Sequence, residues 1–400
     1  MRHSTGGAFL GELRQEARWL RGGWYPDFVT AASPKLPEDD VPVFVFHTIE
    51  PQEFEAQLSY LAENGYVTLT CDGFLRHLTG EAAAPPRSVL LTIDDGRASV
   101  WKFGLPLLRK FGARAAVFLI PGYVRQGGVP SPTSGRGRSA RDPARRASHG
   151  DAELMTWPEI ERGAETGSLD FQAHTLYHHR VPVGPRVVDH VRPTMSGPIF
   201  DLPVEQGLEE ALAAGGLEAV YGAPLYENDS LMSGRPLYRP NPELARVCID
   251  HVASAGGEAF FRSPSWRGRL RRVVDDWVER HGAPGALESD TSTTRAMIDD
   301  LRRARLEIEK HVRGKEVRHL CLPYTIGSTR AIEAAREVGY RTCFWGVLPH
   351  RNTNRPGQDP YHCPRLKADY ITRLPGRGRR SLRFILAHKL KRRLSGRPVY

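Results

Sequence analysis

The sequence lacks features that define several protein classes. Its 400 residues contain no apolar run long enough to cross a membrane, so we expect no transmembrane segment. Residues 1–12 contain no long apolar stretch and already include an acidic residue. This pattern predicts no secretory signal and therefore a cytoplasmic protein.

Cysteine is scarce and scattered. The five cysteines are odd in number and show no C-x-x-C spacing. This distribution argues against a disulfide framework and against a thiolate metal site. We therefore expect reduced, buried cysteines at positions Cys71, Cys248, Cys321, Cys343 and Cys363.

Acidic residues are missing from one region only. The formal net charge is +10, and residues 371–400 contain ten Lys or Arg but no Asp or Glu. The rest of the chain is close to neutral and gives no argument for nucleic-acid binding. In this basic tail, residues 381–394 carry apolar side chains at helical spacing. They predict either a helix lying on an anionic membrane surface or a helix docked on the body with a solvated charged face.

Strand-like apolar runs alternate with helical patterns over residues 41–346. This alternation is typical of parallel strands joined by helical crossovers. It predicts an α/β fold, an irregular β/α barrel of six or seven strands, with an open doubly wound sheet as the alternative. The expected strands cover 41–47, 66–70, 88–95, 114–121, 169–174, 318–324 and 341–346.

Changes in amino-acid composition divide the chain further. Residues 1–40 form a lead-in, residues 41–370 the main domain and residues 371–400 the basic tail. A stretch at about 180–292 is rich in Pro and Gly and contains two helical patterns. We interpret it as a large, mainly helical insertion that begins beside the predicted pocket, where it would cap the site.

Two adjacent carboxylates end the most continuous apolar run. Residues 89–93 are typical of a buried strand, and Asp94, Asp95 and Gly96 follow directly. Carboxylates at the end of a buried strand are costly without a counter-charge, which a metal ion could supply. Asp-Asp-Gly is also ordinary turn chemistry, and this stretch alone does not decide between the two interpretations.

Polar side chains also follow other expected strands. Because the carboxyl ends of parallel strands meet at one edge of a sheet, we expect these side chains around one pocket. His174 and His178 are four residues apart and, with Asp95, offer two nitrogens and one oxygen to a divalent ion such as Zn²⁺. Alternatively, the two histidines lie in a loop after the strand, where they are solvated and bind no metal. The strand-end residues are His47, Asp94, Asp95, His174, Pro323 and Tyr324.

Two motifs resemble those of a known family. Residues 92–96 resemble the T-F-D-D-G motif of polysaccharide deacetylases, the NodB-homology or carbohydrate esterase family 4 domain, and residues 174–178 resemble its H-[ST]-x-x-H motif. The resemblance covers roughly 41–178 and 293–367. Its flanking elements are the first strand with Phe46-His47-Thr48-Ile49, the tryptophan-bearing helix that starts at Thr156-Trp157, and Leu322-Pro323-Tyr324.

The resemblance implies an enzyme that hydrolyses N-acetyl, less often O-acetyl, groups on sugars. Asp94 would be the general base. Asp95, His174 and His178 would hold a divalent metal, Zn²⁺ with Co²⁺ or Ni²⁺ as alternatives. The backbone N–H of Tyr324 would help to stabilise the oxyanion. The main domain would then be a NodB-type catalytic domain acting on an acetylated carbohydrate.

Several positions depart from the family pattern. Ile93 replaces the usual aromatic residue, Arg97 follows the glycine where an aromatic is common, and Thr325 stands where glycine is usual. No terminal L-x-H motif is placed to supply a general acid, so His47 and His350 are the candidates. Two rival functions stay open: hydrolysis of another non-peptide C–N bond, as in a cyclic amide or amidine, and an inactive carbohydrate-binding homologue.

Overall fold

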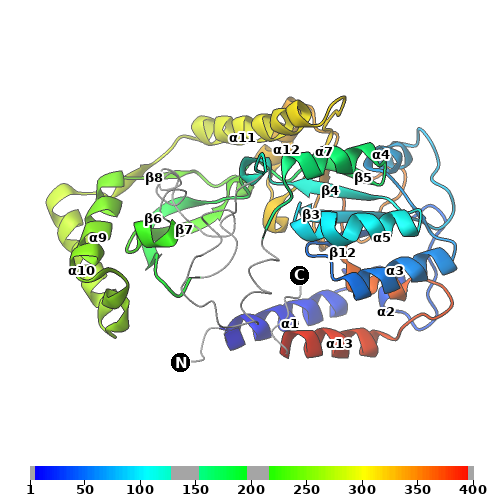
Figure 1. Ribbon diagram of the computed structural model, residues 1–400, viewed down its shortest axis with the longest axis horizontal. Coiled ribbons are helices and arrows are strands. Elements are labelled where there is room, and N and C mark those ends of the chain that lie inside the picture. The colour runs from blue at the N-terminus through cyan, green and yellow to red at the C-terminus, as the bar shows by residue number, and fades with distance from the viewer. Residues whose placement is uncertain (1–4, 128–152, 196–215, 395–400) are drawn as a thin grey trace.

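The core of the protein is a curled sheet of parallel strands. The computed structural model describes residues 5–127, 153–195 and 216–394 (Figure 1). The strands of the sheet are β1 (Val43–Phe46), β2 (Val67–Thr68), β3 (Ser88–Asp95), β4 (Ala115–Leu119), β5 (Leu169–Ala173), β10 (His319–Cys321), β11 (Thr342–Phe344) and β12 (Leu366–Lys367). Their order is β11-β10-β5-β4-β3-β1-β12, and β2 pairs with the start of β3. All these pairings are parallel, as the alternating pattern predicts.

Helices cover the outside of this sheet. All eight residues of β3 are buried, which explains the near-continuous apolar run. In α11, buried side chains recur at helical spacing at Met297, Leu301, Ala304 and Ile308. The helices of the body are α2 (Asp27–Thr30), α3 (Pro51–Glu63), α4 (Cys71–Thr79), α5 (Leu105–Lys110), α7 (Trp157–Glu165), α11 (Asp290–His311) and α12 (Thr329–Val338).

A short segment late in the chain connects the two edges of the sheet. Cys363 forms a parallel bridge with Phe344 in β11, and its carbonyl accepts a hydrogen bond from the Trp345 N–H at 2.9 Å. Three residues later, β12 begins and pairs with β1. Residues 363–367 therefore contact both edge strands. The sequence did not predict this strand, because two residues after a proline show no periodicity.

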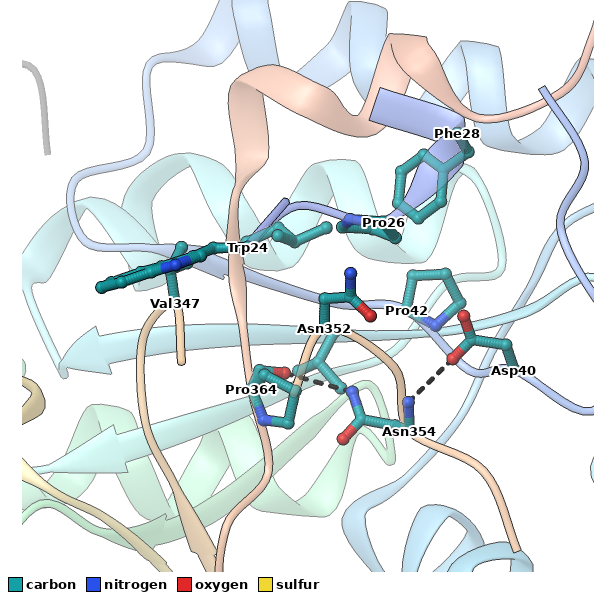
Figure 2. A pocket seen from close by; sticks show the side chains of 11 residues that line it. Trp24, Pro26, Phe28, Asp40, Pro42, Val347, Asn352, Asn354 and Pro364 are labelled. Carbon is teal, nitrogen blue, oxygen red and sulfur yellow. Dashed lines mark hydrogen bonds between the residues drawn. The ribbon is translucent and has the colours of Figure 1, made fainter. Parts of the chain in front are cut away.

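Asn354 and Asp40 anchor this segment through hydrogen bonds. The Asn354 N–H donates to Asp40 at 2.8 Å, and the Asn354 side chain donates to the carbonyl of Pro364 at 3.1 Å (Figure 2). Both polar residues are buried beside a small pocket that Trp24 and Phe28 also line. Burial raises the pKa of Asp40 to about 6, and the hydrogen bond from Asn354 opposes this rise.

The insertion combines helices with strands. It contains α9 (Pro242–Ser254) and α10 (Trp266–His281), which match the two helical patterns of the sequence. It also contains two antiparallel pairs that the sequence analysis missed: β6 (Arg180–His190) with β7 (Pro224–Ser230), and β8 (Tyr238–Pro240) with β9 (Gly285–Leu287). The prediction of a mainly helical insertion was therefore too simple. The helices pack around their own apolar cluster, which includes Leu244, Cys248, Leu270 and Trp277.

The basic tail contains a helix that docks on the body. α13 (Leu382–Leu394) lies beside α1 (Thr5–Arg21) (Figure 1). Lys389 is 1% exposed and donates a hydrogen bond to Glu16, which also accepts one from the Tyr370 hydroxyl at 2.6 Å. Burial alone would raise the pKa of Glu16, but Lys389, the Tyr370 hydroxyl and Lys367 together outweigh burial and lower it. α13 therefore docks on the body, and contact of its outer face with a membrane stays a prediction.

Other cationic side chains of the tail also bind acceptors of the body. Arg373 donates to the carbonyls of Val29 and Ala31, and Arg379 donates to that of Ala31. Arg392 pairs with Glu53 at 2.6 Å. Four of the ten tail cations therefore bind acceptors of the body, and two of them, Lys389 and Arg392, pair with carboxylates. Among the described residues, no helix is both long and apolar enough to cross a membrane.

We predict that the Lys389–Glu16 pair anchors α13. Lys389→Ala leaves the Glu16 carboxylate buried without its cation, which should lower the free energy of unfolding by about 3 kcal/mol. Lys391→Ala, on the exposed face of the same helix, should change it by less than about 0.5 kcal/mol. Urea unfolding of the three proteins measures both values. Equal stability of the two variants would contradict the docking role of Lys389.

Candidate active site

The carboxyl ends of four parallel strands bring the predicted side chains together. β1 ends one residue before His47, β3 ends at Asp95, and β5 ends one residue before His174. Tyr324 follows β10 in a short helical turn, Pro323–Thr325. Because β1, β3, β4, β5 and β10 run parallel, these ends meet at one edge of the sheet. The fold therefore places these strand-end residues at one edge of the sheet.

Three side chains form a group suited to a metal ion. Asp95, His174 and His178 each offer one ligand atom, and these atoms all lie within 4.8 Å of one another. The Oδ1 atom of Asp95 lies 3.8 Å from Nε2 of His174. One carboxylate oxygen and two imidazole nitrogens are ligands that Zn²⁺ and similar divalent ions take in proteins.

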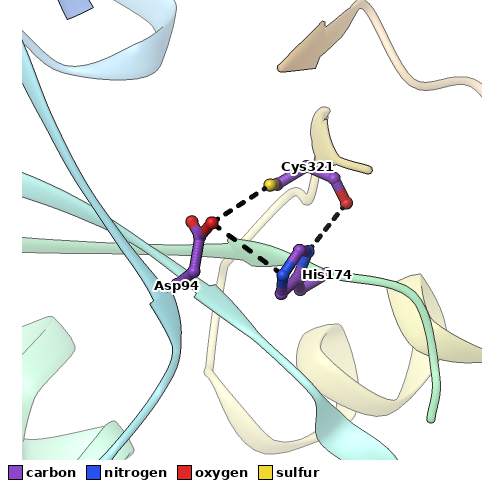
Figure 3. Close-up of side chains that lie close together, drawn as sticks. All are labelled: Asp94, His174 and Cys321. Atoms are coloured by element: carbon purple, nitrogen blue, oxygen red, sulfur yellow. Dashed lines mark hydrogen bonds and ion pairs between the residues drawn. The ribbon is translucent and has the colours of Figure 1, made fainter. Parts of the chain in front are cut away.

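The orientation of His174 is fixed by its second nitrogen. Its Nδ1–H donates to the carbonyl oxygen of Cys321 at 2.9 Å (Figure 3). This hydrogen bond places the proton on Nδ1 and leaves the lone pair of Nε2 directed at the carboxylates. His174 is therefore prepared to act as a metal ligand.

His178 is held in its neutral form. Burial is the main cause and neighbouring His174 the second, and together they lower the pKa of His178 to about 3. Its ring lies 4.5 Å from the ring of Tyr324, whose hydroxyl donates to the His178 carbonyl at 3.3 Å. A neutral imidazole is the form that binds metals, so His178 fits the same group as His174.

Asp94 is set apart from Asp95 by its own cation. Arg365, in the segment that connects the sheet edges, donates from Nη1 and Nη2 to the two oxygens of Asp94, each at 2.7 Å. Burial would raise the pKa of Asp94, but Arg365 is the largest opposing cause and holds it well below its usual range. Asp94 is therefore an ionised acceptor that stands outside the Asp95 ligand group.

A second arginine holds Asp95. Nε and Nη2 of Arg97 contact Oδ2 of Asp95 at 2.9 and 2.8 Å, and both side chains are buried. Oδ2 is thus occupied, while Oδ1 is directed at His174. In the sequence, Arg97 stands out only as a departure from the family pattern. The structure shows that it presents one oxygen of Asp95 to the candidate metal site.

Backbone strain is concentrated at this site. The described part of the chain contains six non-glycine residues with positive φ, and five of them are Asp95 (70°), Thr175 (64°), His178 (59°), Tyr324 (57°) and Thr325 (59°). Left-handed φ costs about 1–3 kcal/mol at each such residue and persists where the surroundings fix it. Thr325 takes the conformation that the usual glycine would adopt without cost. Holding these residues in place therefore lowers the stability of the folded protein.

The loop between the two histidines is anchored from α11. The backbone N–H of Leu176 donates to Oδ1 of Asp300 at 3.1 Å, and the Leu176 carbonyl accepts from the Gly122 N–H at 2.8 Å. The Thr175 hydroxyl accepts from the His178 N–H at 3.1 Å. Burial raises the pKa of Asp300 to about 7. Asp300 thus acts through the loop and helps to position both imidazoles.

The two candidate acids occupy different places. Nε2 of His47 lies 3.9 Å from Oδ2 of Asp94, and its side chain is 25% exposed. His350 is exposed in the turn bridged by Leu348 and Arg351. Within the described residues, no hydrogen bond or ion pair joins His350 to Asp94. The structure therefore brings His47 into the site and leaves His350 at the surface.

The insertion begins at the rim of this site. β6 starts at Arg180, whose guanidinium lies 4.5 Å from the centre of the Tyr324 ring. The insertion therefore contacts the site through its first residue. Its capping role stays a prediction, because residues 196–215 lie outside the described residues.

Comparison with known proteins identifies the region that contains the two motifs. Residues 81–195 match the family model described as Polysaccharide deacetylase. This region belongs to the polysaccharide deacetylase family. YxkH of Bacillus subtilis, whose name places it among the polysaccharide deacetylases, is 33% identical over 88 residues, 20% of this chain and 32% of that protein. The family resemblance drawn from the motifs is confirmed.

A second relative is named for its substrate. The poly-beta-1,6-N-acetyl-D-glucosamine N-deacetylase of Staphylococcus epidermidis is 22% identical over 138 residues, 34% of this chain and 40% of that protein. The chain thus spans well under half of the length of these two relatives.

The fold matches solved deacetylase structures. The BpsB deacetylase domain of Bordetella bronchiseptica matches 84% of this chain and 98% of its own, with TM-score 0.51 and 18% identity. A de-N-acetylase of Aggregatibacter actinomycetemcomitans matches 82% and 96%, with TM-score 0.50 and 16% identity. These likenesses confirm the predicted fold, a NodB-type β/α barrel.

We predict that His178 makes the stability of the metal-free protein pH-dependent. Its pKa is lowered from 6.5 to about 3, so the unfolded chain binds a proton in this interval that the folded chain does not. The free energy of unfolding should therefore fall as the pH decreases from 6.5 towards 3. His178→Asn should show a shallower fall, measured by urea unfolding at several pH values.

The control for this measurement is an exposed histidine. His350→Asn should retain the pH dependence of the wild type, because its side chain is at the surface. The assignment of a buried neutral His178 is wrong when His178→Asn and the wild type give the same slope.

Proposed function

We propose that this protein is a metal-dependent hydrolase that removes an N-acetyl, or less often O-acetyl, group from a sugar or glycan precursor. One observation carries the proposal. The ligand group Asp95, His174 and His178 lies beside Asp94, an ionised carboxylate that is outside the group and paired with Arg365. This arrangement separates metal binding from proton transfer.

The relatives support the proposed reaction class. Both curated relatives are named as deacetylases, and one name specifies an N-acetyl-D-glucosamine polymer. Deacetylases of this kind are hydrolases that cleave a carbon–nitrogen bond other than a peptide bond. We infer the same class of activity here, on an acetylated carbohydrate.

The side chains present fit a divalent metal ion. Nε2 of His174 has its lone pair available, His178 is neutral, and Asp95 offers its Oδ1 atom. Two nitrogens and one oxygen favour Zn²⁺, and Co²⁺ and Ni²⁺ accept the same ligands. A bound ion would lower the pKa of a water molecule and polarise the acyl carbonyl.

Side chains of the protein would then take part in two proton transfers. Asp94 would accept a proton from the attacking water, for which its ionised state is required. The backbone N–H of Tyr324 would donate to the developing oxyanion. As the C–N bond breaks, the leaving nitrogen needs a proton. His47, 3.9 Å from Asp94, is better placed than His350 to deliver it. The products are acetate and a free amine.

We predict that Asp94→Asn removes activity but keeps the metal. Loss of the base should lower kcat by about 10²–10⁴-fold, because proton transfer by a positioned side chain contributes that much. Acetate release from N-acetylglucosamine oligomers measures the rate, and metal analysis measures occupancy. Chelation should abolish wild-type activity, and added Zn²⁺ should restore it.

The control for this variant is Asp170→Asn. Asp170 lies at the opposite end of β5 from the site and pairs with Lys315, so its substitution should leave kcat within about twofold. The catalytic assignment is wrong if Asp94→Asn is as active as Asp170→Asn, or if the wild type binds no divalent metal.

The same assays separate the rival functions. Acetate release from acetylated sugars supports deacetylation, whereas ring opening of small cyclic amides or amidines identifies the other C–N hydrolysis. Sugar binding with neither reaction identifies an inactive carbohydrate-binding homologue. We propose an intracellular, lipid- or nucleotide-linked sugar as the substrate of a cytoplasmic enzyme.

We also propose that the outer face of α13 contacts anionic lipid. Phe384 and Leu390 are 49% and 40% exposed there, and Arg383 and Lys391 lie between them around the helix. Each surface cation contributes about 1 kcal/mol of attraction to an anionic bilayer. Co-sedimentation with vesicles that contain phosphatidylglycerol should weaken at least about tenfold in Arg383→Glu/Lys391→Glu.

A charge-matched control tests this surface. Arg302→Glu/Lys310→Glu makes the same charge change on α11, where both side chains are about half or more exposed. This control should bind vesicles like the wild type. Equal loss in both double variants would show a net-charge effect and contradict a specific α13 surface.

A further inference from the structure

A thiol lies inside the candidate active site. Cys321 ends β10, is fully buried, and places its Sγ atom 3.5 Å from Oδ2 of Asp94. With His174, these residues form a second group whose ligand atoms all lie within 4.8 Å of one another (Figure 3). The site therefore contains two overlapping sets of potential metal ligands, one with a sulfur and one without.

The two sets share a single nitrogen. Nε2 of His174 lies 3.8 Å from Oδ1 of Asp95 and 3.9 Å from Oδ2 of Asp94. Because Nδ1–H of His174 is bonded to the Cys321 carbonyl, only Nε2 has a lone pair available. One lone pair binds one ion. An ion on the Asp94 side would therefore exclude an ion that uses His174 on the Asp95 side.

We propose that Asp94, His174 and Cys321 form a second, inhibitory site for a thiophilic divalent ion such as Cd²⁺ or excess Zn²⁺. Binding there uses the carboxylate that the proposed reaction needs as its base, and it withdraws His174 from the catalytic ligand set. The site is a property of the metal-binding side chains and does not depend on which bond the protein hydrolyses.

The chemistry of the sulfur determines which ions bind. Thiolate ligands favour soft ions, while the Asp95, His174 and His178 set contains only nitrogen and oxygen. The thiol must lose its proton to solvent when the ion binds, because the thiolate is the ligand. Burial raises the pKa of the Cys321 thiol well above its usual value, and Arg365, whose Nη2 lies 3.0 Å from Sγ, is the largest cause that opposes this rise.

The same guanidinium makes the site selective. Its positive charge repels a second cation, so only an ion that gains strongly from a thiolate bond should overcome the repulsion. Hard ions such as Mg²⁺, which prefer oxygen ligands, gain nothing from the sulfur.

A neighbouring cysteine supplies a matched control. Cys343 lies on β11, next to β10, and is as deeply buried as Cys321. Among the described residues, it belongs to no group of His, Cys, Asp or Glu that could hold an ion. A buried thiol without carboxylate and imidazole partners should not bind Cd²⁺.

The experiment is a Cd²⁺ titration of the full chain followed by the ultraviolet thiolate-to-metal absorption. The wild type should develop this absorption and release protons. Cys321→Ala should lose the absorption, while Cys343→Ala should keep it. Asp95→Asn should retain it and bind Cd²⁺ at the sulfur site more readily, because the competing ligand set is weakened.

A second measurement needs no variant. Cd²⁺ should protect Cys321 of the wild type from alkylation by iodoacetamide at least about tenfold, as mass spectrometry of the modified peptide would show. Absence of the absorption in the wild type, its survival in Cys321→Ala, or loss of it in Cys343→Ala would each overturn the proposal. None of these readouts uses a substrate, so they fail or succeed separately from the deacetylase assays.

Discussion

The buried contact between Arg365 and Asp94 makes this pocket possible. Two ionised carboxylates at the end of a buried strand are too costly to remain charged without partners. Arg365 compensates Asp94, and Arg97 compensates Asp95, each at hydrogen-bond distance. From the sequence, a metal ion was expected to supply this counter-charge. The structure shows that two guanidiniums already supply it within the protein.

These two arginines also give the carboxylates different roles. Both oxygens of Asp94 accept from Arg365, which keeps its charge next to the ligand group but outside it. Arg97 takes one oxygen of Asp95 and leaves the other for the ion. The strained φ angles at Asp95 and His178 hold the ligands in this arrangement. The conformational energy of this strain is offset by packing of the surrounding barrel.

Sequence patterns predicted the parts of the site that depend on strand ends. β3 runs over the expected residues 88–95, and the ligands follow β3 and β5 because parallel strands end at one edge. Arg365 could not be found in this way. It lies 271 residues from Asp94, just before a two-residue strand with no periodicity, and its only signal was a lone arginine between apolar residues. The antiparallel pair of β6 and β7 was missed because Pro182, Gly184 and Pro185 interrupt the alternation of β6.

The position of Arg365 has a consequence for inactivation. Its segment, residues 363–367, is largely buried and is bonded to the body by many hydrogen bonds, among them Cys363 N–H to the Cys343 carbonyl at 3.0 Å and Arg365 N–H to the Gly346 carbonyl at 3.1 Å. Segments with buried side chains and protected hydrogen bonds open only at free energies close to that of global unfolding. Opening of these five residues, which would withdraw the guanidinium from Asp94, should therefore accompany unfolding of the sheet. On heating, the protein should keep its ionised base until the core of the fold is lost.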